Sequence, residues 1–129
     1  MERPTVLIAE DEAIAGLELK EMLERLGCAV VGIVTGGDAV VETATRLRPR
    51  IIVMDINLRS FIDGIDAADR IAMIAPIPVI YVTAYSDPDL RLRALRTKPA
   101  GYLVKPVRES VLKECIDGAL RREGRLGGA

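Results

Sequence analysis

Short apolar segments of strand length alternate along the chain with longer segments in which apolar residues recur at helical spacing. The apolar segments predict five strands, at residues 6–9, 28–34, 51–54, 79–82 and 100–104. Residues 51–54 are apolar at every position, which is typical of a strand buried on both faces. Strands that alternate with helical segments indicate βαβ units and therefore a parallel sheet.

The segments between and after these strands have the boundary residues of helices. In the first of them, Ile14, Leu17, Met22 and Leu26 lie near one face, and Gly27 is the expected end. The helices are expected at residues 13–26, 36–47, 63–75, from 86–88 onward, and about 109–122.

Strict alternation of five strands and five helices within 129 residues predicts an α/β fold. We expect a flavodoxin-like, doubly wound, five-stranded parallel sheet, (βα)5, with strand order 2-1-3-4-5. The length fits one domain, expected over residues 1–124. The glycine-rich residues 125–129 are expected to form a flexible tail.

Charge and apolar content narrow the class of protein. With 18 basic and 19 acidic residues the net charge is −1, which gives no electrostatic case for binding nucleic acid or an anionic membrane. No apolar run reaches the roughly 18 residues that span a bilayer, and the first residues do not resemble a signal peptide. A cytoplasmic protein is expected, with Cys28 and Cys115 as reduced, mostly core residues.

The chain contains no histidine. It therefore cannot build a Ser-His-Asp or Cys-His centre or a zinc site with histidine ligands. Any polar chemistry must come from carboxylates, lysine, hydroxyl groups or a hard metal ion.

Polar side chains follow four of the predicted strands, at the carboxyl ends where parallel α/β sheets place their sites. They are Glu10-Asp11-Glu12, Asp55, Thr83 and Lys105-Pro106. Each alone has an ordinary structural interpretation, as a helix cap or a turn residue. Chance is a poor account of all four together, because each falls at the end of a predicted strand. Crowded carboxylates also repel one another and lose hydration, so such a cluster would lower stability if it had no function.

A divalent cation would relieve that repulsion, and Mg²⁺ suits a site made only of oxygen ligands. Lysine supplies a fixed positive charge for a phosphoryl oxygen, and a hydroxyl group can bind another. Asp55 then remains as a nucleophile that accepts a phosphoryl group.

Four segments resemble the receiver domains of two-component response regulators, over about residues 4–122. They are residues 6–12, 52–58, 79–84 and 101–106. The resemblance implies that Asp55 is the phosphoacceptor and that Glu10 and Asp11 are the acidic pair, with Asp11 the direct Mg²⁺ ligand. Asp55 and the backbone carbonyl of Asn57 would complete the protein ligands. Glu10 replaces the aspartate of many members.

The resemblance also assigns the residues of the switch. Thr83 and Lys105 would contact the phosphoryl group, and Ala84 would be the small residue that leaves access to it. Tyr102 would be the aromatic residue that turns inward, and the Lys105-Pro106 bond is often cis in this family.

The loop after Asp55 departs from the family pattern. Arg59 stands where many members have proline, and Gly64 lies nine residues after Asp55 where many have a glycine at eight. Residues 59–62 therefore form a longer loop beside the site.

The resemblance implies a phosphorylation switch and no enzyme, beyond self-phosphorylation from small donors and slow autodephosphorylation. Its partners would be a histidine kinase or histidine phosphotransfer protein and a downstream protein or output domain. A homodimer could form through the helix after residue 86, strand 100–104 and the last helix. The arginines of this region form either a basic partner face or a solvated helix face: Arg91, Arg93, Arg96 and Arg108.

Two other functions use a similar fold. A small phosphatase of the haloacid dehalogenase type also has a strand-end aspartate, Mg²⁺ and a lysine, but it usually has a second aspartate where this chain has Asn57. A flavodoxin-like FMN binder is a poorer fit, because the sequence has no tryptophan, only three tyrosines and one phenylalanine, and no Ser- and Thr-rich loop after the first strand.

Overall fold

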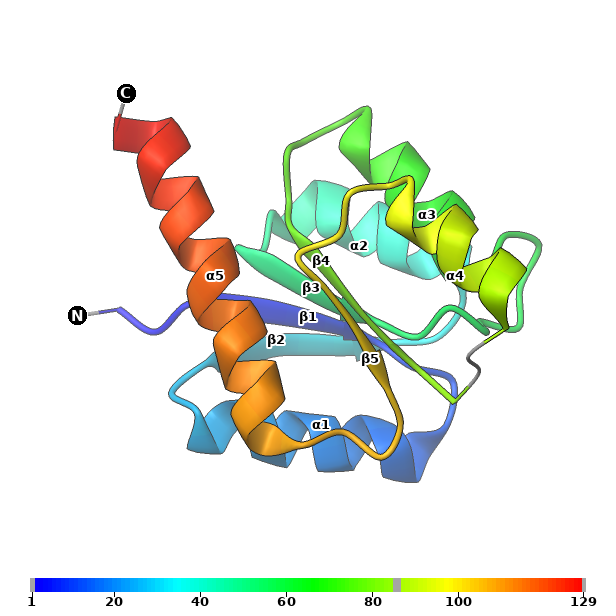
Figure 1. Ribbon diagram of the computed structural model, residues 1–129, viewed down its shortest axis with the longest axis horizontal. Coiled ribbons are helices and arrows are strands. Elements are labelled where there is room, and N and C mark those ends of the chain that lie inside the picture. The colour runs from blue at the N-terminus through cyan, green and yellow to red at the C-terminus, as the bar shows by residue number, and fades with distance from the viewer. Residues whose placement is uncertain (1, 85–86, 129) are drawn as a thin grey trace.

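The computed structural model describes residues 2–84 and 87–128, with side chains as far as Arg122. Ten elements alternate along the chain (Figure 1). The strands are β1 (Thr5–Ala9), β2 (Ala29–Val34), β3 (Ile51–Met54), β4 (Val79–Thr83) and β5 (Gly101–Val104). The helices are α1 (Ala13–Arg25), α2 (Gly37–Leu47), α3 (Gly64–Ala72), α4 (Pro88–Leu95) and α5 (Glu109–Gly128).

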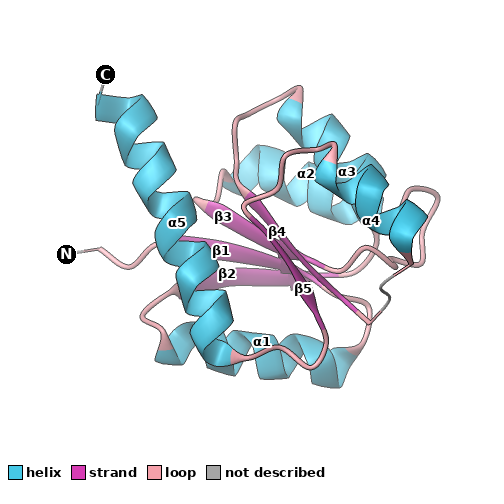
Figure 2. Cartoon of the chain, in the orientation of Figure 1, coloured by secondary structure: helices cyan, strands magenta, loops and turns pink. Residues whose placement is uncertain are grey.

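The strands form one parallel sheet in the order β2-β1-β3-β4-β5, which confirms the predicted fold class and strand order. The sheet is the middle layer of three (Figure 2). Helices α1 and α5 cover one face, and α2, α3 and α4 cover the other (Figure 1). Each connection between parallel strands must cross over the sheet, which is why a helix follows every strand.

Two apolar clusters hold these layers together, one on each face of the sheet. Leu7, Ile52 and Met54 point into the cluster under α2, α3 and α4. Val6 and Val53 point into the cluster under α1 and α5. All four residues of β3 are fully buried, as the apolar run at 51–54 predicts.

The buried face of α1 agrees only in part with the predicted one. Met22 and Leu26 pack against the core as predicted. Gly16, Leu19 and Leu23 face the sheet, whereas Ile14 is 75% exposed and Leu17 is 54% exposed. At position 16 a β-carbon would lie 3.2 Å from Cγ2 of Ile33. The glycine therefore lets the helix backbone approach the sheet. With Gly16 on the face toward the sheet, Ile14 and Leu17 point toward solvent.

The helix boundaries agree with the sequence at most ends. Gly36 precedes α2 with φ of 88°, a conformation that favours glycine. Asp87 caps α4 by accepting the N–H of Asp89, while the predicted start at Ser86 lies outside the described residues.

The last helix extends beyond the Arg122 that the sequence predicts, to Gly128. It overlaps the predicted tail, and Ala129 lies outside the described residues. Flexibility of residues 125–129 stays a prediction.

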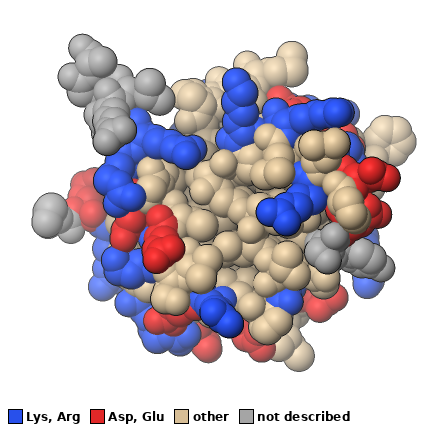
Figure 3. Space-filling view, viewed as in Figure 1, with Lys and Arg blue, Asp and Glu red and all other residues tan. Residues whose placement is uncertain are grey.

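The surface carries charges of both signs. On the face seen in Figure 3, Lys and Arg side chains are mixed with Asp and Glu around a largely uncharged centre. Within the described part of the chain, no helix has the length and apolar character needed to cross a membrane.

Candidate functional site

Four strand ends meet at one edge of the sheet and carry the polar residues singled out in the sequence. Ala9 at the end of β1 pairs with Met54 at the end of β3, so that Glu10 and Asp55 follow side by side. Thr83 at the end of β4 pairs with Val104 of β5, and Lys105 comes next. The register of the parallel strands therefore brings these side chains to the same edge.

Lys105 joins the two carboxylates nearest to it. Its Nζ lies 3.2 Å from Oδ2 of Asp55 and 3.3 Å from each carboxylate oxygen of Glu10. The side chain of Glu10 is only 1% exposed and that of Asp55 11%, whereas Lys105 is 24% exposed. The ammonium group thus offsets part of the repulsion between two nearly buried acids.

Burial and the repulsion that remains between Glu10 and Asp55 both contribute to a raised pKa of Glu10. Burial, together with the hydrogen bond and charge of Asp55, raises the pKa of Glu10 to about 7, although Lys105 acts to lower it. Burial acts to lower the pKa of Lys105, but the carboxylates of Asp55 and Glu10 outweigh it and raise that pKa. One lysine therefore does not fully neutralise the pair, and a further cation would be favourable here.

The backbone fixes Asp55 at the end of β3. Its N–H donates to the carbonyl of Ala9 at 3.0 Å, and its Oδ1 accepts the N–H of Asn57 at 2.9 Å. Gly64, the first residue of α3, donates its N–H to the carbonyl of Ile56. One carboxylate oxygen of Asp55 is thus held by the backbone and the other faces Lys105.

The carboxylates border an open pocket of about 430 Å³. The polar residues Asn57, Arg59 and Lys105 also line this pocket. Its lining residues are Glu10, Asp11, Glu12, Asp55, Asn57, Arg59, Ala84 and Lys105. The carboxylate oxygens of the acidic lining residues are ligands of the kind that hard divalent cations prefer, so these acids fit Mg²⁺ in their chemistry.

The ligands of such an ion are not gathered in this arrangement. Among the residues that the structure describes, no three His, Cys, Asp or Glu side chains lie close enough together to hold a metal. Glu10 and Asp55 share Lys105, whereas the carboxylate of Asp11 accepts the backbone N–H groups of Gly36 and Arg59.

Of the residues predicted for the switch, Ala84 and Lys105 line this pocket and Thr83 ends the neighbouring strand β4, whereas Tyr102 lies on β5 outside the pocket lining. Thr83 is fully buried at the end of β4, and Ala84 is exposed and borders the pocket. Tyr102 is partly buried, with its ring edge-on to Tyr81 at 6.4 Å between centroids. The Lys105-Pro106 bond is cis, as expected from the resemblance.

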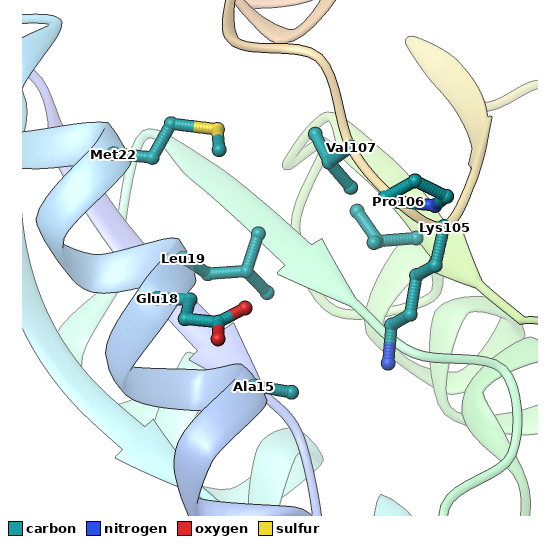
Figure 4. Close-up of a pocket in the computed structure, with 8 residues that line it drawn as sticks. Ala15, Glu18, Leu19, Met22, Lys105, Pro106 and Val107 are labelled. Atoms are coloured by element: carbon teal, nitrogen blue, oxygen red, sulfur yellow. The ribbon is translucent and has the colours of Figure 1, made fainter.

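A second pocket, also of about 430 Å³, lies between α1 and the segment after β5 (Figure 4). Leu19 and Met22 of α1 face Pro106 and Val107 across it, and Lys105 borders both pockets. This groove could not be predicted from the sequence, because the apolar residues that line it come from segments far apart along the chain.

The contacts of the arginines on α4 could also not be predicted from the sequence. Arg93 binds Asp63 and Asp66 at the start of α3, with N–O distances of 2.8 and 2.7 Å. Arg91 lies over the ring of Tyr102, 5.6 Å from its centroid. The spacing Asp63-x-x-Asp66 before an apolar helix is a capping-box pattern, and it was the available signal for the acidic partner of Arg93.

Comparisons with known proteins agree with this geometry. The family model of the response regulator receiver domain matches residues 6–117. The transcriptional regulatory protein PdtaR of Mycobacterium tuberculosis is 41% identical over 117 residues, which cover 91% of this chain and 57% of that protein. The chemotaxis protein CheY of Thermotoga maritima is 31% identical over 87% of this chain and 93% of its own length.

A solved structure is similar over nearly the whole chain. The signal receiver domain of a modulated diguanylate cyclase from Desulfovibrio desulfuricans G20 superposes with a TM-score of 0.88 at 38% identity, covering 94% of this chain and 96% of that one. The chain spans little more than half the length of PdtaR. By its family match, its relatives and its fold, this chain belongs to the response regulator receiver domains of two-component signalling.

Proposed function

We propose that the domain is a switch in which Asp55 accepts a phosphoryl group from a phosphohistidine that lies outside this sequence. The observation that carries this proposal is the ammonium group of Lys105, which lies 3.2 Å from Asp55 and also contacts Glu10 at the open edge of the sheet. A lysine in this position can bind an oxygen of the incoming phosphoryl group while the carboxylate attacks. The sequence has no histidine, so the donor lies outside it.

In the transfer, a carboxylate oxygen of Asp55 attacks phosphorus. The new O–P bond forms as the P–N bond of the donor breaks, and the leaving imidazole takes up a proton. Attack by water on the acyl phosphate later restores the carboxylate and releases inorganic phosphate. Oδ2 is the better candidate for the attacking atom, since Oδ1 accepts the N–H of Asn57.

Glu10, Asp11, Asp55 and the backbone carbonyl of Asn57 are the proposed protein ligands of Mg²⁺. When bound, the ion supplies positive charge that offsets the charge of the phosphoryl oxygens. The placement of Glu10 and Asp55, nearly buried side by side at Lys105, supports this assignment, because a cation would offset the burial and repulsion that raise the pKa of Glu10.

Phosphorylation adds negative charge and acceptor oxygens beside Lys105 and Thr83. We propose that both residues move toward these oxygens, that Ala84 leaves room for them, and that Tyr102 fills space behind Thr83. The surface of α4, β5 and α5 then changes, which is a two-state response to a local charge change.

The proposed partners are a histidine kinase or histidine phosphotransfer protein and a downstream protein or output domain. A homodimer through α4, β5 and α5 is part of the same proposal. The receiver unit is assigned to residues 1–124 and the cytoplasm is its proposed location.

The test is modification by acetyl phosphate, followed by intact-mass spectrometry. We expect one phosphoryl group per chain, dependent on Mg²⁺ and absent from Asp55→Asn. Asp69→Asn, an exposed acid on α3, is the matched control and should be labelled like the wild type. Labelling that persists in Asp55→Asn would reject the assignment. Hydrolysis of a phosphomonoester beyond one equivalent per chain would favour the phosphatase alternative.

A further inference from the structure

The carboxylate of Asp11 joins two loops at the mouth of the site. Its Oδ1 accepts the N–H of Gly36 at 2.9 Å, in the turn between β2 and α2. Its Oδ2 accepts the N–H of Arg59, in the loop between β3 and α3. A carboxylate that accepts two backbone N–H groups is strongly held in its orientation.

A second contact fastens the same two loops. Oγ of Ser60 accepts the N–H of Gly37 at 2.7 Å and donates to the carbonyl of Ile62 at 2.6 Å. At Gly37 a β-carbon would lie 2.4 Å from the carbonyl oxygen of Ile62, so the two backbones are in direct contact. Residues 59–62 are thus held against the start of α2 by Asp11 at one end and by Ser60 at the other.

This contact is also favourable electrostatically. Gly36 is the N-cap residue of α2, and its N–H is one of the donors that a helix start leaves without an internal acceptor. A carboxylate near the start of a helix gains from the helix dipole. Asp11 therefore has a stable alternative to binding a metal.

The loop contacts of Asp11 and its proposed role as a Mg²⁺ ligand require different orientations of its carboxylate. Glu10 and Asp55 lie together at Lys105, and no three acidic side chains of the described residues are close enough to share an ion. Asp11 is the acid whose carboxylate is turned elsewhere, toward Gly36 and Arg59.

We infer that Asp11 is a positioning residue that either fastens the 59–62 loop to the start of α2 or turns to Mg²⁺. This inference rests on the proposed function, because it takes the acids of the pocket as the Mg²⁺ site. By linkage the coupling is reciprocal: a fastened loop weakens Mg²⁺ binding, and Mg²⁺ loosens the loop. The longer loop of this chain is thereby made sensitive to the ion.

Amide exchange measured by NMR on the unmodified protein tests the inference directly. Saturating Mg²⁺ should speed exchange of the N–H groups of Gly36 and Arg59 relative to KCl at the same ionic strength. The N–H of Ala29, which donates to Pro4 far from the pocket, is the internal control and should not change. Saturation with Mg²⁺ while Gly36 and Arg59 stay equally protected would overturn the inference but leave the proposed function standing.

A variant that does not touch the ligands gives the reciprocal test. Ser60→Ala removes one fastening contact, so Mg²⁺ affinity measured by calorimetry should rise about three- to tenfold, the equivalent of one hydrogen bond. Ser110→Ala, at an exposed position of α5, is the matched control and should leave the affinity unchanged. An unchanged or weaker affinity in Ser60→Ala contradicts the inference, and no Mg²⁺ binding by the wild type rejects it together with the proposed metal site.

Discussion

Gly64 offers a sharp test of how closely α3 packs on the phosphoacceptor strand. It is buried, and a β-carbon there would lie 2.3 Å from the carbonyl oxygen of Asp55 and 3.0 Å from Cα of Ile56. Both atoms belong to the backbone, so no side chain can rotate away to make room. Gly64→Ala must therefore move α3 or the end of β3.

Two effects of opposite sign decide the size of the change. Alanine is favoured over glycine inside a helix by about 1 kcal/mol, and by less at a first helical position. Forced overpacking costs about 1–3 kcal/mol when the neighbours can shift, and a backbone contact belongs at the upper end. We expect Gly64→Ala to lower the free energy of unfolding by about 1–3 kcal/mol.

Gly118 is the matched control, because an added β-carbon there meets only an ordinary van der Waals contact. It lies inside α5, and the nearest atom to an added β-carbon is the guanidinium of Arg121 at 3.9 Å. Only the helix preference remains, so Gly118→Ala should raise the free energy of unfolding by about 0.5–1 kcal/mol. The two variants should thus differ from the wild type in opposite directions.

Urea denaturation followed by circular dichroism measures both. With a slope of about 1–3 kcal/mol per M urea, a loss of about 2 kcal/mol moves the midpoint down by roughly 1 M. If Gly64→Ala unfolds at the wild-type midpoint or above it with an unchanged slope, α3 does not press on Asp55 as described. Since the contact is with Asp55 itself, slower labelling by acetyl phosphate should accompany the loss of stability.

Two further predictions concern other parts of the fold. Arg93→Ala removes the ion pairs with Asp63 and Asp66 and, at such exposed positions, should cost about 0.5–1 kcal/mol in urea denaturation, less at high salt. Burial acts to raise the pKa of Asp63, but the N–H of Asp66 and the side chain of Arg93 outweigh it and lower that pKa. The loss of unfolding free energy in Arg93→Ala should therefore be full above about pH 4 and become smaller below it. A loss that stays constant with pH would contradict this role. Leu112→Ala, at a fully buried position, should cost about 2–5 kcal/mol, whereas Leu92→Ala, 54% exposed, should cost less than about 0.5 kcal/mol; equal losses would refute the assigned core.

The sequence was sufficient to predict the sheet and the residues at its edge. In a parallel sheet every strand points the same way, so a polar residue after an apolar run is placed at a known edge whatever the helices do. Glu10, Asp55, Thr83 and Lys105 follow this rule, and the register of β1 with β3 and of β4 with β5 brings them level. Alternation alone does not determine strand order, which was predicted from the fit of five alternating units to the flavodoxin-like fold.

Contacts that depend on the path of loops and the rotation of helices could not be predicted in this way. The buried face of α1 is set by the close approach at Gly16, which helical spacing alone does not reveal. The contacts of Asp11 with Gly36 and Arg59 were not predicted either, because they join two loops that are far apart in sequence. The sequence left Arg93 either in a basic partner face or in a solvated helix face, because its ion pairs with Asp63 and Asp66 depend on where α4 packs.

The loop after Asp55 shows how the domain tolerates its departure from the usual spacing. Gly64 comes one position later than in many family members, yet it still starts α3 directly against the carbonyl of Asp55. The extra residue must therefore be accommodated before Gly64, within residues 59–62, where Asp11 and Ser60 provide acceptors for backbone N–H groups. The added length therefore lies beside Asp11, whose carboxylate contacts Arg59, whereas Lys105 contacts Asp55 at 3.2 Å through the strand ends that the sheet register fixes.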